Sequence, residues 1–226
     1  MKPAARPRVA RRPKRAGPRL RAIALGIVAL VGAAGGSSFW WWPRPADVSP
    51  IGPVEAIVFF GDSITSGHSL PTEQAFPALV GQALGVRAIN AGVSGNTSGD
   101  ALRRVEPDVL AHQPRLVVVQ FGGNDFLRQV PKDETLRNLD AILDRLTTAG
   151  AAVVLLEMHV GLGDDPYLDG FGSLAAKYRA LLVPNFMRGI LSNPALKLDA
   201  IHPNAEGHQL LAQRVADALR PLLAAP

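Results

Sequence analysis

The sequence contains no cysteine in its 226 residues. Disulfide bonds, thiolate metal sites and a cysteine nucleophile are therefore excluded, although this absence does not identify the cellular compartment. Aromatic residues make up only 6% of the chain and charged residues 19%, whereas 47% of the residues are hydrophobic. A chain of this size and apolar content can bury a sizeable core in one domain and still carry an appendage.

Acidic residues are absent from residues 1–44, which hold ten lysines and arginines. The whole chain has 24 basic and 19 acidic residues, so the remaining part holds 14 basic and 19 acidic residues, a net charge of −5. The excess positive charge therefore belongs to the N-terminal segment. The mildly acidic remainder argues against nucleic acid as a partner.

A stretch without any charge covers residues 22–42. Its 21 residues match one helical crossing of a ~30 Å hydrocarbon layer. Basic flanks stay on the cytoplasmic side of a membrane and tryptophans favour the interface. We therefore predict a basic cytoplasmic tail over residues 1–21 and a transmembrane anchor over residues 22–42, with Trp40, Trp41 and Trp42 at the far interface.

A cleaved secretory signal is the competing interpretation of residues 22–42, because such signals also begin with basic residues and continue with small and apolar ones. The bulky FWWWP sequence at the end of the apolar run favours an uncleaved anchor. Under both interpretations the rest of the chain lies outside the cytoplasm, either tethered by a single membrane span or secreted. Residues 43–53 contain four prolines and predict a stiff linker, which leaves residues 54–226 for a globular domain.

Short apolar runs alternate with helical patterns through this domain. The runs predict buried strands at residues 54–60, 86–89, 116–121, 152–157 and 180–183. Helical spacing of apolar residues predicts helices over residues 72–84, 98–112, 135–148, 171–179 and 203–219, the second of them divided at Pro107. Strand alternating with helix five times indicates an α/β fold: a three-layer α/β/α sandwich around a flavodoxin-like, five-stranded parallel sheet.

Polar, glycine-rich turns follow the first three predicted strands. The turns read GDSIT at 61–65, NAGVSGNTS at 90–98 and GGND at 122–125. The carboxyl ends of parallel strands meet at one edge of a sheet, and ligands bind there. Ser63 is therefore predicted to lie at the rim of a crevice, flanked by glycines that let backbone approach closely.

A histidine and an aspartate stand three residues apart in the C-terminal stretch LKLDAIHPNAEG. A serine hydroxyl becomes a nucleophile when an imidazole takes its proton, and a carboxylate orients that imidazole. Ser63, His202 and Asp199 supply these three groups. The oxyanion formed by attack on a carbonyl needs preorganised N–H donors. The candidate donors are the N–H of Ser63, the turn backbone at Gly92 and the side-chain amide of Asn124.

These sequence blocks resemble the SGNH (GDSL) hydrolase family, and within it the bacterial arylesterase, acyl-CoA thioesterase and lysophospholipase branch. The resemblance places the four residues that name the family at Ser63, Gly92, Asn124 and His202, and the aspartate of the triad at Asp199. It implies a serine ester hydrolase that cleaves acyl esters or thioesters through an acyl-enzyme, without a cofactor. The membrane predicted above would then be a bacterial cytoplasmic membrane.

The resemblance covers about residues 54–222, so residues 54–226 are interpreted as an SGNH hydrolase domain. The chain contains no GxSxG motif, which agrees with this family. After the fourth strand the family branch has a longer substrate loop, whereas here the loop reads MHVGLGDDPYLDGF. The acyl-chain specificity therefore stays open, and lipids and acylated glycans are both candidate substrate classes.

Two further functions are kept as alternatives. The first is a carbohydrate O-acetyl esterase acting on envelope or exported polysaccharide, which the extracytoplasmic placement and the polar loop at residues 161–169 favour. The second is a membrane-tethered binding domain that has kept the fold and lost its chemistry, since a fold does not guarantee activity.

Several other polar residues are predicted to be structural. Asp62 neighbours the serine and is interpreted as a turn residue rather than the triad acid, and Asp125 as a residue that satisfies backbone. His68 is predicted to face solvent, because no aspartate follows to orient it. Arg103 and Arg104 are interpreted as a solvated helix face.

A metal requirement is not predicted. Asp199, His202, Glu206 and His208 include ligand types, but His208 falls within the last predicted helix and no further cluster at metal spacing appears. The predicted partners are thus a small acyl ester or thioester and a membrane, without metal, cofactor or nucleic acid.

Overall fold

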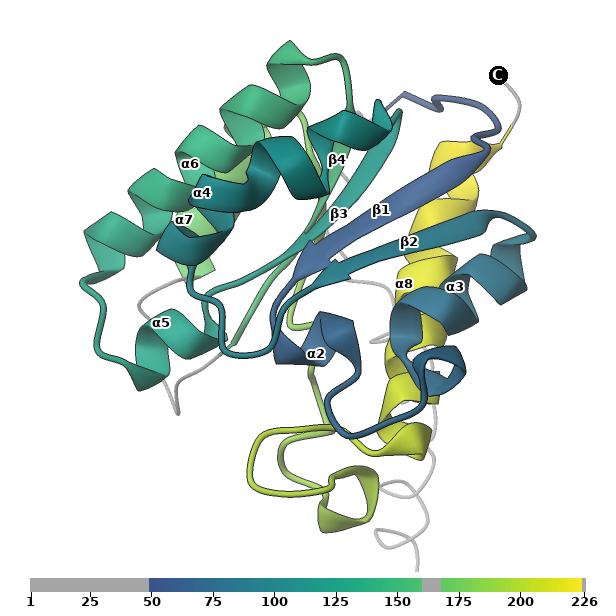
Figure 1. Cartoon of the computed structure of the whole chain (residues 1–226), viewed down its shortest axis with the longest axis vertical. Coiled ribbons are helices and arrows are strands. Elements are labelled where there is room, and N and C mark those ends of the chain that lie inside the picture. The colour runs from purple at the N-terminus through teal and green to yellow at the C-terminus, as the bar shows by residue number, and fades with distance from the viewer. Residues whose placement is uncertain (1–48, 160–167, 225–226) are drawn as a thin grey trace, which may run out of the picture. The chain divides into compact units, whose positions relative to one another are not determined.

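The protein is described by a computed structural model that covers residues 49–159 and 168–224 (Figure 1). The predicted tail, membrane segment and most of the linker, residues 1–48, lie outside the described residues, as do residues 160–167 of the polar loop. Within the two described ranges, no helix has both the length and the apolar composition needed to cross a bilayer.

Five parallel strands form one sheet in the order β2-β1-β3-β4-β5 (Figure 1). They are β1 (Ala56–Gly61), β2 (Arg87–Gly92), β3 (Leu116–Gln120), β4 (Ala152–Leu156) and β5 (Leu181–Val183). All five predicted strands are confirmed, and β5 is only three residues long. The strand order reverses between β1 and β3, which is where open parallel sheets bind ligands at their carboxyl edge.

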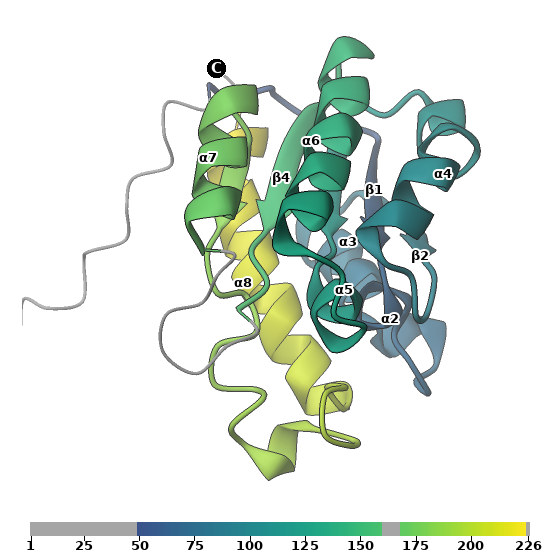
Figure 2. The same cartoon turned by 90° about the vertical axis from the view of Figure 1, so that its left-hand side faces the viewer.

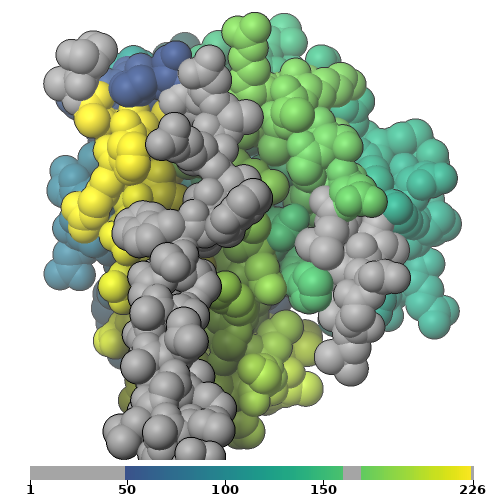
Figure 3. All heavy atoms as spheres, turned by 180° about the vertical axis from the view of Figure 1, so that it is seen from behind, coloured from purple at the N-terminus to yellow at the C-terminus, as the bar shows by residue number. Residues whose placement is uncertain are grey.

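Helices cover both faces of the sheet (Figures 1 and 2). The longer ones are α3 (Phe76–Leu84), α4 (Ser98–Asp108), α6 (Lys132–Thr148), α7 (Leu168–Tyr178) and α8 (Ala205–Leu223). Helices α3 and α8 pack against each other on one face, whereas α4, α6 and α7 form the layer on the other. Figure 3 shows the molecule from behind, with α8 in yellow and α7 in light green at its surface. The α/β sandwich is thus as predicted.

Strand β1 supplies side chains to both helical layers. Phe59 meets Phe76 of α3 edge to face at 5.8 Å, and Phe60 meets Phe121 in the same manner at 5.0 Å. All four rings are fully buried. Successive side chains of a strand point to opposite faces, so a strand covered on both sides must be apolar at every position. This requirement explains the uninterrupted IVFF sequence that leads to the glycine-rich turn.

The break predicted at Pro107 lies slightly later in the chain. Helix α4 continues through Pro107 to Asp108, and a short 3-10 helix, η3 (Leu110–His112), follows. Proline has a helical φ and costs the helix only the hydrogen bond of its missing N–H and a clash with the preceding turn. The expected pair of short helices is therefore one helix and a 3-10 turn.

The turns predicted after the first and third strands contain a helical turn each. These are α2 (Ser63–Ser66) and α5 (Gly123–Leu127). Two further 3-10 helices, η2 (Thr72–Gln74) and η4 (Pro194–Leu196), precede α3 and α8. Helices α2 and α5 both begin at the carboxyl edge of the sheet, and they bring Ser63 and Asn124 to that edge.

Candidate active site

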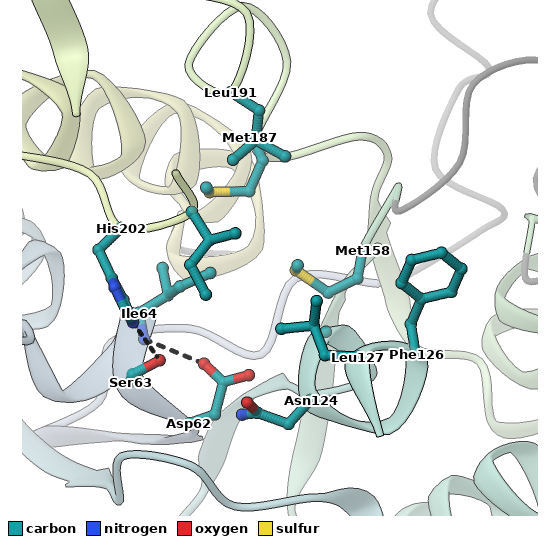
Figure 4. A pocket seen from close by; sticks show the side chains of 12 residues that line it. Asp62, Ser63, Ile64, Asn124, Phe126, Leu127, Met158, Met187, Leu191 and His202 are labelled. Carbon is teal, nitrogen blue, oxygen red and sulfur yellow. Dashed lines mark hydrogen bonds between the residues drawn. The ribbon is translucent and has the colours of Figure 1, made fainter. Parts of the chain in front are cut away.

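Ser63 is the first residue of α2, directly after β1 (Figure 4). Asp62 caps this helix, because its Oδ1 accepts a hydrogen bond of 3.0 Å from the N–H of Ile64. The chain turns so sharply here that a Cβ atom on Gly61 would lie 2.0 Å from Oγ1 of Thr65. Only glycine fits at that position, so the GDS sequence is a steric and capping requirement of the strand-to-helix turn.

Three groups form a continuous hydrogen-bonded chain. Nε2 of His202 lies 3.1 Å from Oγ of Ser63, a residue 139 positions away in the sequence (Figure 4). Nδ1 of the same ring lies 2.7 Å from Oδ2 of Asp199. A proton on Nδ1 is held by the carboxylate, which leaves Nε2 free to accept the proton of the serine hydroxyl. The predicted set Ser63, His202 and Asp199 is therefore brought together.

The carboxylate of Asp199 is stabilised in its charged form. Hydrogen bonds from the His202 ring and from the backbone N–H groups of Ile201 and His202, the latter two at 2.9 Å, hold the pKa of Asp199 well below its ordinary value. The side chain is 49% exposed, so burial opposes the charge very little. This carboxylate can orient and charge-balance an imidazolium throughout the neutral pH range.

The turn that carries these two residues is tied down at both ends. The N–H of Leu198 donates to the carbonyl of His202 at 2.9 Å, and Lys197 pairs with Pro203 in an isolated antiparallel bridge. Asn204 then caps α8 through its side chain. An exposed loop is thereby held in one geometry against the long helix behind it.

Asp62 has the opposite environment. Its side chain is 2% exposed, and burial raises its pKa to about 6 despite the hydrogen bond from Ile64. Asp62 caps α2. Among the described residues, the His202 ring forms its hydrogen bonds with Asp199 and Ser63 and none with Asp62. The interpretation of Asp62 as a structural turn residue is confirmed.

Asn124 of α5 faces the same crevice (Figure 4). Its Nδ2 donates one hydrogen bond of 3.0 Å to the carbonyl of Asn96, which leaves the second hydrogen of the amide for another acceptor. The neighbouring Asp125 is buried and accepts from the N–H of Ser98 at 2.9 Å and from Oγ1 of Thr135 at 3.2 Å. As predicted, Asp125 satisfies backbone, and it ties α5 to the start of α4.

Gly92 does not have the role predicted for it. Its N–H already donates to Oδ1 of Asn90 at 2.9 Å, so it is not free to receive an oxyanion. The glycine is required for another reason, because a Cβ atom here would lie 2.3 Å from the backbone nitrogen of Ser66 in α2. The assignment of Gly92 to the oxyanion hole is therefore wrong.

The second glycine of the NAGVSGNTS turn is the better candidate. The N–H groups of Gly95 and Ser63 have no hydrogen-bond acceptor among the described residues. Gly95 has φ +80°, a left-handed conformation that favours glycine, and the next residue, Asn96, is the one that binds Asn124. The two glycines of this turn cannot be distinguished by sequence spacing alone.

The interpretation of Arg104 as a solvated residue is also wrong. Its side chain is 14% exposed, compared with 73% for Arg103. Its two terminal nitrogens donate at 2.8 Å to the carbonyls of Ala91 and Gly61, and Nε donates to Oδ1 of Asn96. One guanidinium thus joins the ends of β1 and β2 to the turn that binds Asn124.

The helical spacing of α4 contains the signal for this placement. Arg104 follows the buried Ala101 by three residues and precedes the buried Val105, so it borders the apolar stripe of the helix. Arg103 points to the opposite side. The guanidinium carbon also lies 4.5 Å from the centre of the Phe60 ring, a cation–π distance.

An apolar cavity of about 220 Å³ adjoins Ser63 and His202 (Figure 4). Its remaining polar lining consists of Asp62 and Asn124. The apolar part is formed by Ile64, Phe126, Leu127, Met158, Met187, Leu191 and Ile201. A pocket of this kind can hold the hydrocarbon part of a substrate with its reacting carbon near the serine hydroxyl.

Comparison with known proteins agrees with this site. The GDSL-like Lipase/Acylhydrolase family model matches residues 59–210. An arylesterase of Vibrio mimicus is 30% identical over 176 residues, which cover 73% of this chain and 88% of that protein. An acetylxylan esterase of Geobacillus stearothermophilus is 32% identical over 205 residues, covering 72% and 93%. The crystal structure of TesA superimposes with a TM-score of 0.69 at 32% identity and covers 74% of this chain and 99% of that one.

An α/β sandwich with a serine, a histidine and an aspartate joined at its carboxyl edge defines the class of serine hydrolases. Within this class, the chain belongs to the GDSL-like lipase/acylhydrolase family. The predicted family and the predicted enzyme class, an ester hydrolase, are confirmed.

Proposed function

We propose that this protein hydrolyses acyl esters with Ser63 as nucleophile, His202 as general base and acid, and Asp199 as the residue that orients the imidazole. The observation that carries the proposal is the hydrogen-bonded chain from Asp199 through His202 to Ser63. Removal of any of these groups breaks a proton path that the other two cannot replace.

The reaction proceeds in two halves. Oγ of Ser63 attacks the acyl carbon while Nε2 of His202 takes its proton, and the leaving alcohol or thiol then departs with that proton. In the second half water attacks the acyl-enzyme while His202 takes its proton, and the bond to Ser63 then breaks. The acid is released and Oγ of Ser63 receives the proton from His202. The negative oxygen of both intermediates is received by the N–H groups of Ser63 and Gly95 and by Nδ2 of Asn124.

A single exchange of serine for alanine tests the nucleophile. Ser63→Ala is expected to lower the turnover of p-nitrophenyl butyrate by at least ~10⁴-fold and to abolish labelling by a fluorophosphonate probe. Ser66→Ala is the matched control, because it removes a hydroxyl from the same helix. Labelling or full turnover by Ser63→Ala would contradict the proposal, and a wild-type protein that is never labelled would instead be a binding domain without chemistry.

The pocket favours an acyl chain of short to medium length. Its lining is almost entirely apolar, and its volume of about 220 Å³ is below the ~300–1,000 Å³ typical of sites for drug-sized ligands. Each methylene buried contributes ~0.8 kcal/mol, which is about a fourfold gain in kcat/KM. The specificity constant should therefore rise along a series of p-nitrophenyl esters and stop rising once the pocket is filled.

A carbohydrate O-acetyl esterase is the second candidate. The similarity to an acetylxylan esterase favours this function. The apolar pocket next to Ser63 instead favours acyl groups longer than acetyl. The same ester series, extended by an acetylated sugar, separates the two. A maximum at acetyl combined with a higher kcat/KM on the sugar would replace the first candidate by the second.

We also propose that residues 22–42 anchor the enzyme in the bacterial cytoplasmic membrane, with the catalytic domain outside the cytoplasm. The support is the uncharged stretch behind a basic tail. The intact protein should be found in the membrane fraction. Protease added to intact spheroplasts should digest its catalytic domain. A full-length mature protein in the culture medium would contradict the anchor, and a shortened one would indicate a cleaved signal.

A further inference from the structure

His68 lies against the ring that serves as the proposed base. The centres of the His68 and His202 rings are 4.2 Å apart and their planes are inclined by 25°. His68 is half-buried rather than facing solvent as predicted, and its ring has no hydrogen bond to any described residue. A second imidazole is therefore available next to the triad and is not engaged by it.

The backbone of α2 determines the place of this second imidazole. Gly67 ends the helix in a left-handed conformation, and the N–H groups of Gly67 and His68 both donate to the carbonyl of Ser63, at 3.1 and 3.0 Å. The short helix that presents the serine hydroxyl therefore also presents His68.

Three ligand atoms converge at this place. One ring nitrogen of His68, one of His202 and one carboxylate oxygen of Asp199 all lie within 4.8 Å of one another. Two imidazoles and a carboxylate are a ligand set of Zn²⁺, which binds such groups at ~2.0–2.2 Å in a tetrahedral arrangement with water in the open position. The two rings are stacked, so at least one of them must turn before both nitrogens point at the same ion. The half-exposed Asp199 gives an ion access from solvent.

We propose that His68, Asp199 and His202 form an inhibitory site for Zn²⁺. Both nitrogens of His202 are already used, one toward Asp199 and one toward Ser63. A ring nitrogen that is bound to a metal ion cannot accept the serine proton or hold the carboxylate. Binding of zinc therefore replaces the hydrogen-bonded chain, and the ion acts as a reversible inhibitor rather than as a cofactor.

Calorimetric titration of the full chain with ZnCl₂ tests the binding independently of activity. The wild type is expected to bind one ion at this site, and His68→Phe, which keeps a flat ring against His202, is expected to bind it at least ~10-fold more weakly. His112→Phe is the matched control, because this exposed histidine lies in η3 and outside the triad. Equal binding by the wild type and His68→Phe would overturn the proposal.

The inhibition itself rests on the proposed ester hydrolysis and is measured separately. Zinc should reduce the turnover of p-nitrophenyl butyrate reversibly, and EDTA should restore it. Measured against its own turnover without zinc, His68→Phe should need at least ~10-fold more zinc for half-inhibition, whereas His112→Phe should behave as the wild type. Loss of activity in EDTA with recovery in zinc would make the metal a cofactor and overturn the proposal. A protein that binds zinc without any esterase activity would contradict the proposed function alone.

Discussion

Two aspartates lie close to Ser63, one at the buried end of β1 and one in the exposed turn before α8. Asp62 is 2% exposed and burial raises its pKa to about 6. Asp199 is 49% exposed in its side chain, and hydrogen bonds from the His202 ring and nearby backbone lower its pKa. The residue beside the nucleophile in sequence is thus a helix cap, and the distant one is a stable anion. The comparison shows that hydrogen-bond donors and water, rather than closeness in sequence, decide which acid serves the histidine.

The turn before α8 and α8 itself contain two histidines in different environments. His202 in the turn bonds Ser63 and Asp199, whereas His208 in α8 is 1% exposed. Nδ1 of His208 accepts from the N–H of Phe76 at 3.0 Å, and burial lowers its pKa to about 4. The neutral, buried His208 therefore accepts a hydrogen bond from the first turn of α3, whereas His202 is placed to act as the base.

The largest expected effect comes from replacing each of the two aspartates in turn and comparing the losses of activity. Asp199→Asn should lower kcat by ~10⁴-fold, because an amide does not hold the required tautomer of His202. Asp62→Asn should stay within ~10-fold of the wild type, since an asparagine oxygen still accepts from the N–H of Ile64. The measurement is the turnover of p-nitrophenyl butyrate by both variants.

Equal losses in the two variants would show that Asp62 takes part in the reaction. A variant with low activity and a lowered melting temperature would instead point to misfolding of α2. Circular dichroism of both proteins therefore accompanies the kinetic measurement.

The next prediction concerns how the stability of the protein depends on pH through two buried groups, Asp62 and His208. The pKa of His208 falls from 6.5 to about 4 on folding, so the unfolded chain binds more protons in that window and stability decreases as pH falls through it. The pKa of Asp62 rises from 3.8 to about 6, so the folded chain binds more protons there and stability increases as pH falls. Each contribution is about 3 kcal/mol, and they oppose each other.

Single variants separate these opposing contributions. Urea unfolding between pH 4 and 7 should show a steeper loss of stability toward acid in Asp62→Asn than in the wild type, because the loss due to His208 is no longer compensated. His208→Asn keeps an acceptor for the N–H of Phe76 and should show the reverse tendency. Parallel pH profiles in all three proteins would contradict both assignments.

The last prediction compares two neighbouring arginines of α4. Arg104→Gln removes hydrogen bonds to Gly61 and Ala91 and should cost about 2–4 kcal/mol of unfolding free energy. Because the same guanidinium holds Asn96, kcat should also fall by ~10-fold or more through displacement of Asn124. Arg103→Gln, the exposed control, should change stability by less than ~0.5 kcal/mol.

Arg104→Lys completes this test. A single ammonium cannot reproduce three bonds of a planar group, so lysine should restore stability only in part. Similar stabilities for the Arg103 and Arg104 variants would contradict the assignment of Arg104 as the residue that joins β1 and β2.

Much of the fold was predictable because its determinants are local. Runs such as IVFF at 57–60 and LVVV at 116–119 are apolar at every position, which only a strand covered on both faces requires. The predictable part of the site followed from the same logic, since the ends of parallel strands share one edge and the turns there are rich in polar residues and glycine. Ser63 and Asn124 were found in this way, whereas Asp199 and His202 were found from their spacing before the last predicted helix and from the groups that a serine nucleophile needs.

The sequence by itself determined the α/β alternation, the GDS turn and the residue types needed for ester hydrolysis. Only the tertiary structure decided that the N–H of Gly92 is occupied, that Arg104 is inside and that His68 lies on the ring of His202. The physical reason is the distance along the chain over which each interaction acts. Strand and turn patterns depend on the next few residues, whereas a free donor, a desolvated charge or a stacked ring depends on segments that meet only after folding.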